Sequence, residues 1–331
     1  MGSKIKFFDI NISNCIKGIA AIFIMFGHYF DGYPWYITMF FSGNLWVGVF
    51  FFFSGYGLKY SLINKENYLD GFLVKKFKQI YLPFFFAETV HTVSSAVISK
   101  TFNVYDILLS CLGFRLSNGS LWYVVELLAI YLIFYICKKY LKNQKFDWIW
   151  IPLYIAFLVF AVLKDIGTWW YISTFTFLIG YYYNSLNNIL HRFETDRLIK
   201  SLTILLFAAA YSLTKYFSYT QTGIGPIPYT YIVTFLNLIS APVFVLFCIT
   251  LCSFASENIK ISNIFKALGS ISYEIYLWHM CVFMMVKLLD INLSLQIIIS
   301  FILTIFISSL LNLEKIIIIF KAKKSIKSPK T

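Results

Sequence analysis

Lys17 and His28 are the residues whose types and spacing most directly suggest chemistry. They lie eleven positions apart, and at about 100° per residue eleven steps return to nearly the same face of a helix, with a rise of about 16 Å. A lysine can hold a polyanionic ligand, and a neutral imidazole can act as a general base or a nucleophile. The pair predicts one helix face with an anion-binding end and a catalytic end. The alternative is a structural histidine that bonds a neighbouring helix.

Two acidic side chains are further candidates for the site. Asp31 follows His28 by three positions, so in a continuous helix its carboxylate would accept a hydrogen bond from the imidazole and raise its basicity. Glu126 lies about one turn after Trp122 and Tyr123, and such aromatic pairs alone are typical of a membrane interface. We predict that Asp31 and Glu126 are catalytic and that Trp122 and Tyr123 line the substrate cavity.

A further histidine belongs to a polar stripe. Ser272, Tyr276 and His279 recur at helical spacing and share one face, with Tyr273 next to it. We predict that these four side chains also line the substrate cavity. The alternative is that they form hydrogen bonds between helices.

Other polar residues have a more structural interpretation. Glu88 and His91 lie three positions apart and predict a buried ion pair. The six cysteines lie almost entirely in apolar stretches and lack the spacing of metal ligands. We therefore expect neither a metal site nor a disulfide framework.

The composition places these residues in an apolar chain. Of 331 residues, 59% are hydrophobic and 13% are charged, and the mean hydropathy is +0.73. Soluble domains carry about 25% charged residues, so a chain this apolar would not cover its surface in water. We expect an all-α, polytopic helix bundle whose main partner is the lipid bilayer.

Ten apolar stretches have the roughly 17–25 residues that a membrane-spanning helix needs. They are residues 13–32, 38–58, 80–99, 120–137, 148–164, 169–184, 199–217, 229–253, 269–289 and 294–320. We interpret residues 1–331 as a single transmembrane domain, with a core at about 10–320 and a short basic cytoplasmic tail at 321–331.

The distribution of positive charge orients this bundle. With ten spans both termini lie on one side, and if that side is the cytoplasm, 22 of the 28 Lys and Arg residues are cytoplasmic and five lie on the opposite side. This bias satisfies the positive-inside rule. It also explains the net charge of +13 without nucleic acid as a partner. We expect a multi-pass protein of the plasma membrane, and the composition is compatible with a bacterial source.

The sequence resembles the membrane-bound acyltransferase family 3 at five places that occur in the family's order. They are Lys17-x(10)-His28, FFFFSGYGL at 50–58, FLVKKFKQIYLP at 72–83, SLWY at 120–123 and SYEIYLWH at 272–279. One departure is the absence of an acid before the phenylalanines of the second helix, where residues 46–49 read WVGV. The role of that acid would pass to Asp31 or be lost.

The resemblance implies transfer of an acyl group, usually acetyl, from cytoplasmic acyl-CoA to a hydroxyl of a cell-surface glycan or its lipid-linked precursor. Acetyl-CoA would be bound by the cations Lys17, Lys75, Lys76 and Lys78 at the cytoplasmic opening. His28 would be the general base or the acyl acceptor. Whether the chain works as a homodimer stays open.

Two other functions compete with an enzyme. A secondary transporter or a lipid-linked sugar flippase would also have ten helices with polar residues inside the membrane. Such proteins often carry Gly- or Pro-broken helices at matching positions of two halves, and the seven prolines show no such match. A non-catalytic subunit that presents a glycan would not need the face shared by Lys17 and His28.

Overall fold

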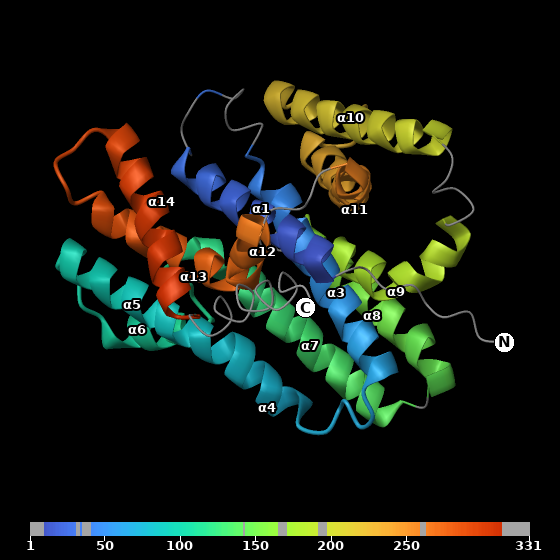
Figure 1. The fold of residues 1–331 in the computed structure, drawn as a ribbon, viewed down its shortest axis with the longest axis horizontal. Coiled ribbons are helices and arrows are strands. Elements are labelled where there is room, and N and C mark those ends of the chain that lie inside the picture. Colours follow the sequence, from blue (N-terminus) through green and yellow to red (C-terminus); the bar gives the residue numbers. More distant parts are fainter. Residues whose placement is uncertain are drawn as a thin grey trace, which may run out of the picture. The chain divides into compact units, whose positions relative to one another are not determined.

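The computed structural model describes residues 10–30, 34, 41–141, 143–164, 171–190, 197–258 and 263–312. Regular structure in these residues is helical, as predicted, apart from an isolated bridge between Ile224 and Ile227. The elements are α1 (Ile10–Tyr29), α3 (Gly43–Asn64), α4 (Phe72–Lys76), the π-helix η1 (Phe77–Tyr81), α5 (Leu82–Ser99), α6 (Val104–Cys111), the 3-10 helix η2 (Gly119–Leu121), α7 (Trp122–Tyr140), α8 (Asn143–Leu163), α9 (Phe175–Leu190), α10 (Arg197–Thr220), α11 (Tyr229–Asn258), α12 (Asn263–Ser270), α13 (Ser272–Val286) and α14 (Leu293–Leu310) (Figure 1).

Each of the ten predicted spans contains one long helix, shifted by a few residues. Among the described residues, four segments are long and apolar enough to cross a membrane: Ile12–Tyr29, Gly119–Tyr140, Tyr229–Ile249 and Leu293–Leu310. Apolar helices of this length indicate a membrane protein. The number of ten crossings and the side of the termini stay predictions.

The chain forms two compact units, and one of them contains Asn44–Tyr68 and Ile151–Ile261 with the start of α1. Within it, α10 packs along α11, and α3 packs against α9 (Figure 1). The α3–α9 contact is made by two glycines, because a Cβ at Gly55 would overlap the Phe177 carbonyl oxygen and a Cβ at Gly180 would overlap that of Phe52. Small residues of this kind let two helix backbones approach closely inside a membrane.

The second unit contains Lys17–Gly43, Leu69–Trp150 and the chain from Ser262 onwards. In it α13 lies beside α14 and α5 (Figure 1). Helix α1 lies along α12 and α13: a Cβ at Gly18 would be 2.8 Å from Gly269 N, and further along α1 the ring of His28 contacts that of His279. The two segments therefore run in the same direction, as the predicted topology gives for the first and ninth spans.

Candidate functional site

The structure brings together two histidines that are far apart in the sequence. His28 on α1 and His279 on α13 have ring centroids 5.2 Å apart, with an angle of 34° between the ring planes. His279 is fully buried, whereas His28 is half-buried and accessible in part. The pair combines a sheltered imidazole with one that a reacting molecule can approach.

The hydrogen bond of His279 determines which nitrogen carries its proton. Its Nδ1 lies 2.8 Å from the backbone oxygen of Tyr276. A carbonyl oxygen only accepts hydrogen bonds, so Nδ1 carries the hydrogen, and in the neutral ring Nε2 holds a lone pair. This Nε2 is buried and has no hydrogen-bond partner among the described residues. It is therefore an acceptor available to an incoming donor.

Tyr29, the residue after His28, links α1 to the backbone of His279. Its hydroxyl donates to the His279 backbone oxygen at 3.2 Å and lies 3.3 Å from the Thr304 hydroxyl on α14. Its ring packs on Phe283 with centroids 4.3 Å apart. Three helices thus meet at the pair. Sequence reasoning missed Tyr29, although its position beside His28 was a signal.

The polar stripe of α13 makes structural contacts with neighbouring segments. The Tyr276 hydroxyl donates to the backbone oxygen of Ser120, and its ring meets that of Tyr123 edge-on with centroids 5.6 Å apart. Ser272 bonds the Gly269 backbone oxygen of its own chain segment at 2.9 Å. Both hydroxyls therefore bond backbone oxygens, and the place of these residues beside a substrate cavity stays a prediction. Among the predicted cavity residues on α13, His279 contacts His28 through its ring.

Trp122, Tyr123 and Glu126 occupy the first turns of α7, which follows the 3-10 helix that contains Ser120. All three are buried, and Glu126 is 1% exposed. Since Tyr123 contacts Tyr276, the start of α7 lies next to the α13 turn that carries His279. The structure thus places Glu126 one turn from this contact.

A π-helical turn joins α4 to α5 and connects to the same α13 motif. Pro83 lacks an N–H, so it cannot bond the residue four positions earlier, and the ladder before it widens to five-residue spacing. The Tyr273 hydroxyl donates to the Ile80 backbone oxygen in this turn at 2.7 Å. Tyr273 therefore anchors α13 to the turn that ends the lysine-bearing segment.

The predicted donor-binding lysines lie on two segments. Lys17 is half-buried on α1, and Lys75 and Lys78 are exposed on α4 and η1. Lys76 lies with its Nζ 4.0 Å from the ring centroid of Tyr131, within the range of a cation–π contact. Lys76 and Tyr131 also line a mainly apolar cavity of about 440 Å³.

The prediction of a Glu88–His91 ion pair is wrong. The Glu88 carboxylate oxygen Oε1 instead accepts from the Ser117 backbone N–H at 2.7 Å and from that of Asn118 at 3.1 Å. The Ser110 hydroxyl is a third donor at 2.5 Å. A buried carboxylate needs no cation when several backbone amides donate to it. These amides lie far from Glu88 in the chain, so no local sequence pattern indicated them. Glu88 therefore positions the loop that leads into α7.

Some predicted features lie outside the described residues, Asp31 above all, together with the basic tail at 321–331. Within the described part of the chain no cluster of His, Cys, Asp and Glu is arranged to hold a metal ion. Cys15, Cys111, Cys137, Cys248 and Cys281 are buried free thiols.

Comparison with known families gives one result that bears on this geometry. A family model described as an acyltransferase domain matches residues 10–313. The chain belongs to this family of acyltransferases. The family prediction from the five sequence motifs is thereby confirmed. Comparison with curated proteins and with solved structures gives no match.

Membership explains why two imidazoles would meet inside an acyltransferase. Acyl transfer to a hydroxyl needs a group that removes the hydroxyl proton as the carbon–oxygen bond forms. The match spans α1 to α14 and therefore includes both histidines. An imidazole is one of the side chains that can take such a proton, so the two histidines are candidates for the site.

Proposed function

We propose that this acyltransferase moves an acetyl group from cytoplasmic acetyl-CoA to a hydroxyl of a cell-surface or exported glycan. In this proposal ten helices cross the plasma membrane of a bacterial cell, with both termini in the cytoplasm. The observation that carries it is the contact between His28 on α1 and His279 on α13, at 5.2 Å between ring centroids. Helix α1 also bears Lys17, eleven positions before His28.

The donor end of the proposal rests on the lysines. Coenzyme A is a polyanion, and Lys17, Lys75, Lys76 and Lys78 would attract its phosphates by charge. Along α1 about 16 Å separate Lys17 from His28, so the cations would stay near water while the thioester reaches the histidines. The apolar cavity beside Lys76 and Tyr131 supports this assignment, since a donor with an uncharged arm needs both surfaces.

The catalytic end assigns one role to each histidine. His28 would take the proton of the acceptor hydroxyl as the hydroxyl oxygen attacks the thioester carbonyl. The bond from carbonyl carbon to sulfur then breaks, and His28 returns the proton to the departing thiolate. The buried Nε2 lone pair of His279 would accept a hydrogen bond from the protonated ring of His28 and stabilise its charge. His279 is therefore a positioning residue.

The function is tested by mass spectrometry of the surface polysaccharide from cells with and without the gene. Acetylation of a hydroxyl adds a group of about 42 Da, which should be absent without the gene and restored by the wild-type gene. The purified protein in lipid nanodiscs should in addition release free thiol from acetyl-CoA only when an acceptor is present. Unchanged polysaccharide mass would contradict the glycan acceptor, and movement of a sugar lipid without acetyl-CoA would support a flippase.

Two substitutions of His279 distinguish the roles of its two ring nitrogens. In His279→Asn the amide N–H can replace Nδ1–H toward the Tyr276 oxygen, but nothing replaces Nε2. In His279→Gln the amide oxygen lies near the position of Nε2 and can accept. We expect kcat to fall about 100-fold in the Asn variant and about tenfold in the Gln variant, because only Gln keeps the acceptor. Equal losses in the two variants, measured by thiol release at saturating acetyl-CoA, would contradict the role of Nε2.

A further inference from the structure

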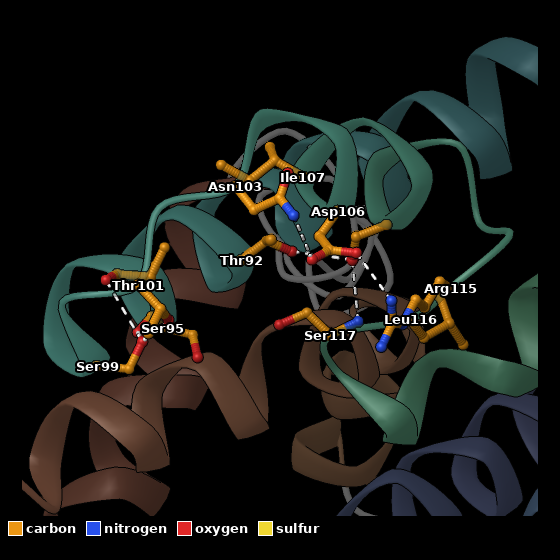
Figure 2. Close-up of a pocket in the computed structure, with 12 residues that line it drawn as sticks. Thr92, Ser95, Ser99, Thr101, Asn103, Asp106, Ile107, Arg115, Leu116 and Ser117 are labelled. Carbon is orange, nitrogen blue, oxygen red and sulfur yellow. Dashed lines mark hydrogen bonds and ion pairs between the residues drawn. The ribbon is translucent and has the colours of Figure 1, made fainter.

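A cavity lies between α5, α6 and the loop before η2, within the second unit. It has a volume of about 260 Å³ and is lined mainly by hydroxyl, amide and charged side chains. Figure 2 shows Ser99 and Thr101 at one end and Asp106 with Arg115 at the other, with Thr92 and Ser117 between them. No residue that the sequence predicted for the site lines this cavity.

The two charged side chains that line the cavity have opposite charges and bond each other. Arg115 donates to one carboxylate oxygen of Asp106 at 2.8 Å, and Asn103 donates to the other at 3.0 Å. The side chains of Arg115 and Asp106 are 73% and 44% exposed, so the ion pair stands at the open rim. One cation and one anion leave no net charge. The cavity therefore suits a neutral ligand with many hydroxyls better than an anionic one.

Buried bonds hold the floor of the cavity. The Thr92 and Ser110 hydroxyls lie 3.0 Å apart, and Ser110 and the Ser117 backbone are both bonded to Glu88 beneath them. The Glu88 Oε2 atom is buried and has no hydrogen-bond partner among the described residues. The floor is thus built before any ligand arrives.

Hydrogen bonds, joined by the covalent chain at Ser120 and Tyr276, connect this floor to the histidines. Asn118, next to Ser117, accepts from the hydroxyl of Ser120 at 2.6 Å. The backbone oxygen of Ser120 accepts from the Tyr276 hydroxyl, and the Tyr276 backbone oxygen accepts from His279. The cavity and the histidine pair are therefore parts of one connected structure.

We propose that this cavity is the acceptor subsite and binds one neutral sugar ring of the glycan. This rests on the proposed function. Cavities for drug-sized ligands measure about 300–1,000 Å³, so this smaller one suits a single ring. In the predicted orientation the loop between the third and fourth spans faces away from the cytoplasm, where an exported glycan is found. Planar Asp, Asn and Arg groups can bond two neighbouring sugar hydroxyls at once.

The test measures binding without turnover. Full-length protein carrying His28→Ala is placed in nanodiscs and titrated by NMR saturation transfer with the methyl glycosides of glucose, galactose, N-acetylglucosamine and glucuronic acid. We expect a neutral glycoside to bind and the glucuronide to bind more weakly. Thr101→Ala should weaken binding about three- to tenfold, because one hydrogen bond is lost. Ser95→Phe should abolish it, because the ring fills the cavity while no bond named above is removed.

A matched control is available at the end of another helix. Thr101 pairs with the Ser99 hydroxyl at 2.6 Å after α5, and Thr222 pairs with the Thr220 hydroxyl at 2.8 Å after α10. Thr222→Ala removes the same kind of bond in the other unit and should leave binding unchanged. Equal binding in Ser95→Phe, no binding of any neutral glycoside, or preference for the glucuronide would overturn the proposal. Glycoside binding that is lost in Ser95→Phe, without acetyl transfer by the wild type, would support the subsite and refute the proposed function.

Discussion

His28→Ala should reduce acetyl transfer by about 10²–10⁴-fold, the usual contribution of a general base. The reason is positional: of the two imidazoles in contact, His28 is the accessible one, and His279 uses its Nδ1–H on the backbone of Tyr276. Transfer is measured by release of free thiol from acetyl-CoA with the purified protein in nanodiscs. The KM for acetyl-CoA should change little, because the proposed donor contacts are lysines.

Added imidazole provides the control for this variant. A small base can enter the space left by the His28 ring and should restore part of the rate, with a dependence on imidazole concentration. The variant should insert into membranes and melt at the temperature of the wild type, since the neighbouring contacts of Tyr29 with Thr304 and Phe283 do not involve the His28 ring. Wild-type activity in His28→Ala would refute the catalytic assignment.

Gly55→Ala should lower the melting temperature by more than about 5 °C, the effect of overpacking a helix contact by some 3 kcal/mol. The added Cβ would overlap the Phe177 carbonyl oxygen and lie 2.9 Å from Tyr181 N. Both atoms belong to the α9 backbone and cannot rotate away as a side chain would. Helices α3 and α9 must therefore separate. Unfolding is followed by intrinsic fluorescence of the protein in detergent.

Gly57→Ala is the matched control on the same helix. A Cβ at Gly57 would meet no atom within 4 Å, so the substitution adds only the better helix propensity of alanine, about 1 kcal/mol. Its melting temperature should equal or exceed that of the wild type. Equal destabilisation by the two alanines would show that Gly55 is needed for another reason than the α3–α9 approach.

Gly55→Ala and His28→Ala distinguish the roles of two family motifs. The sequence at 50–58 resembles a family signature. In the structure it is a packing surface of the first unit, where Thr176 also bonds the Gly48 backbone oxygen at 2.9 Å. In the proposed function, the signature that contains His28 takes part in acyl transfer. We therefore expect Gly55→Ala to lower stability and His28→Ala to lower the rate of acyl transfer.

Much of the candidate site was predictable because helical faces are local. Lys17 and His28 share α1, and Ser272, Tyr276 and His279 share α13, as their spacing indicates. The burial of Glu126 was indicated by the apolar stretch that contains it, against the preference of its residue type. The hydrogen-bond partners of these side chains were less predictable. Ser272 and Tyr276 bond backbone oxygens, and an acceptor of that kind has no sequence signature.

The sequence by itself determined the class of protein, the positions of the long helices and the family, because hydropathy, length and motif order are properties of short segments. Only the tertiary structure decided that His28 meets His279, that Glu88 holds a loop rather than His91, and that Gly55 serves helix packing. Each of these contacts joins segments distant in the chain. They depend on which faces of different helices meet, and spacing within one helix carries no information about its neighbour.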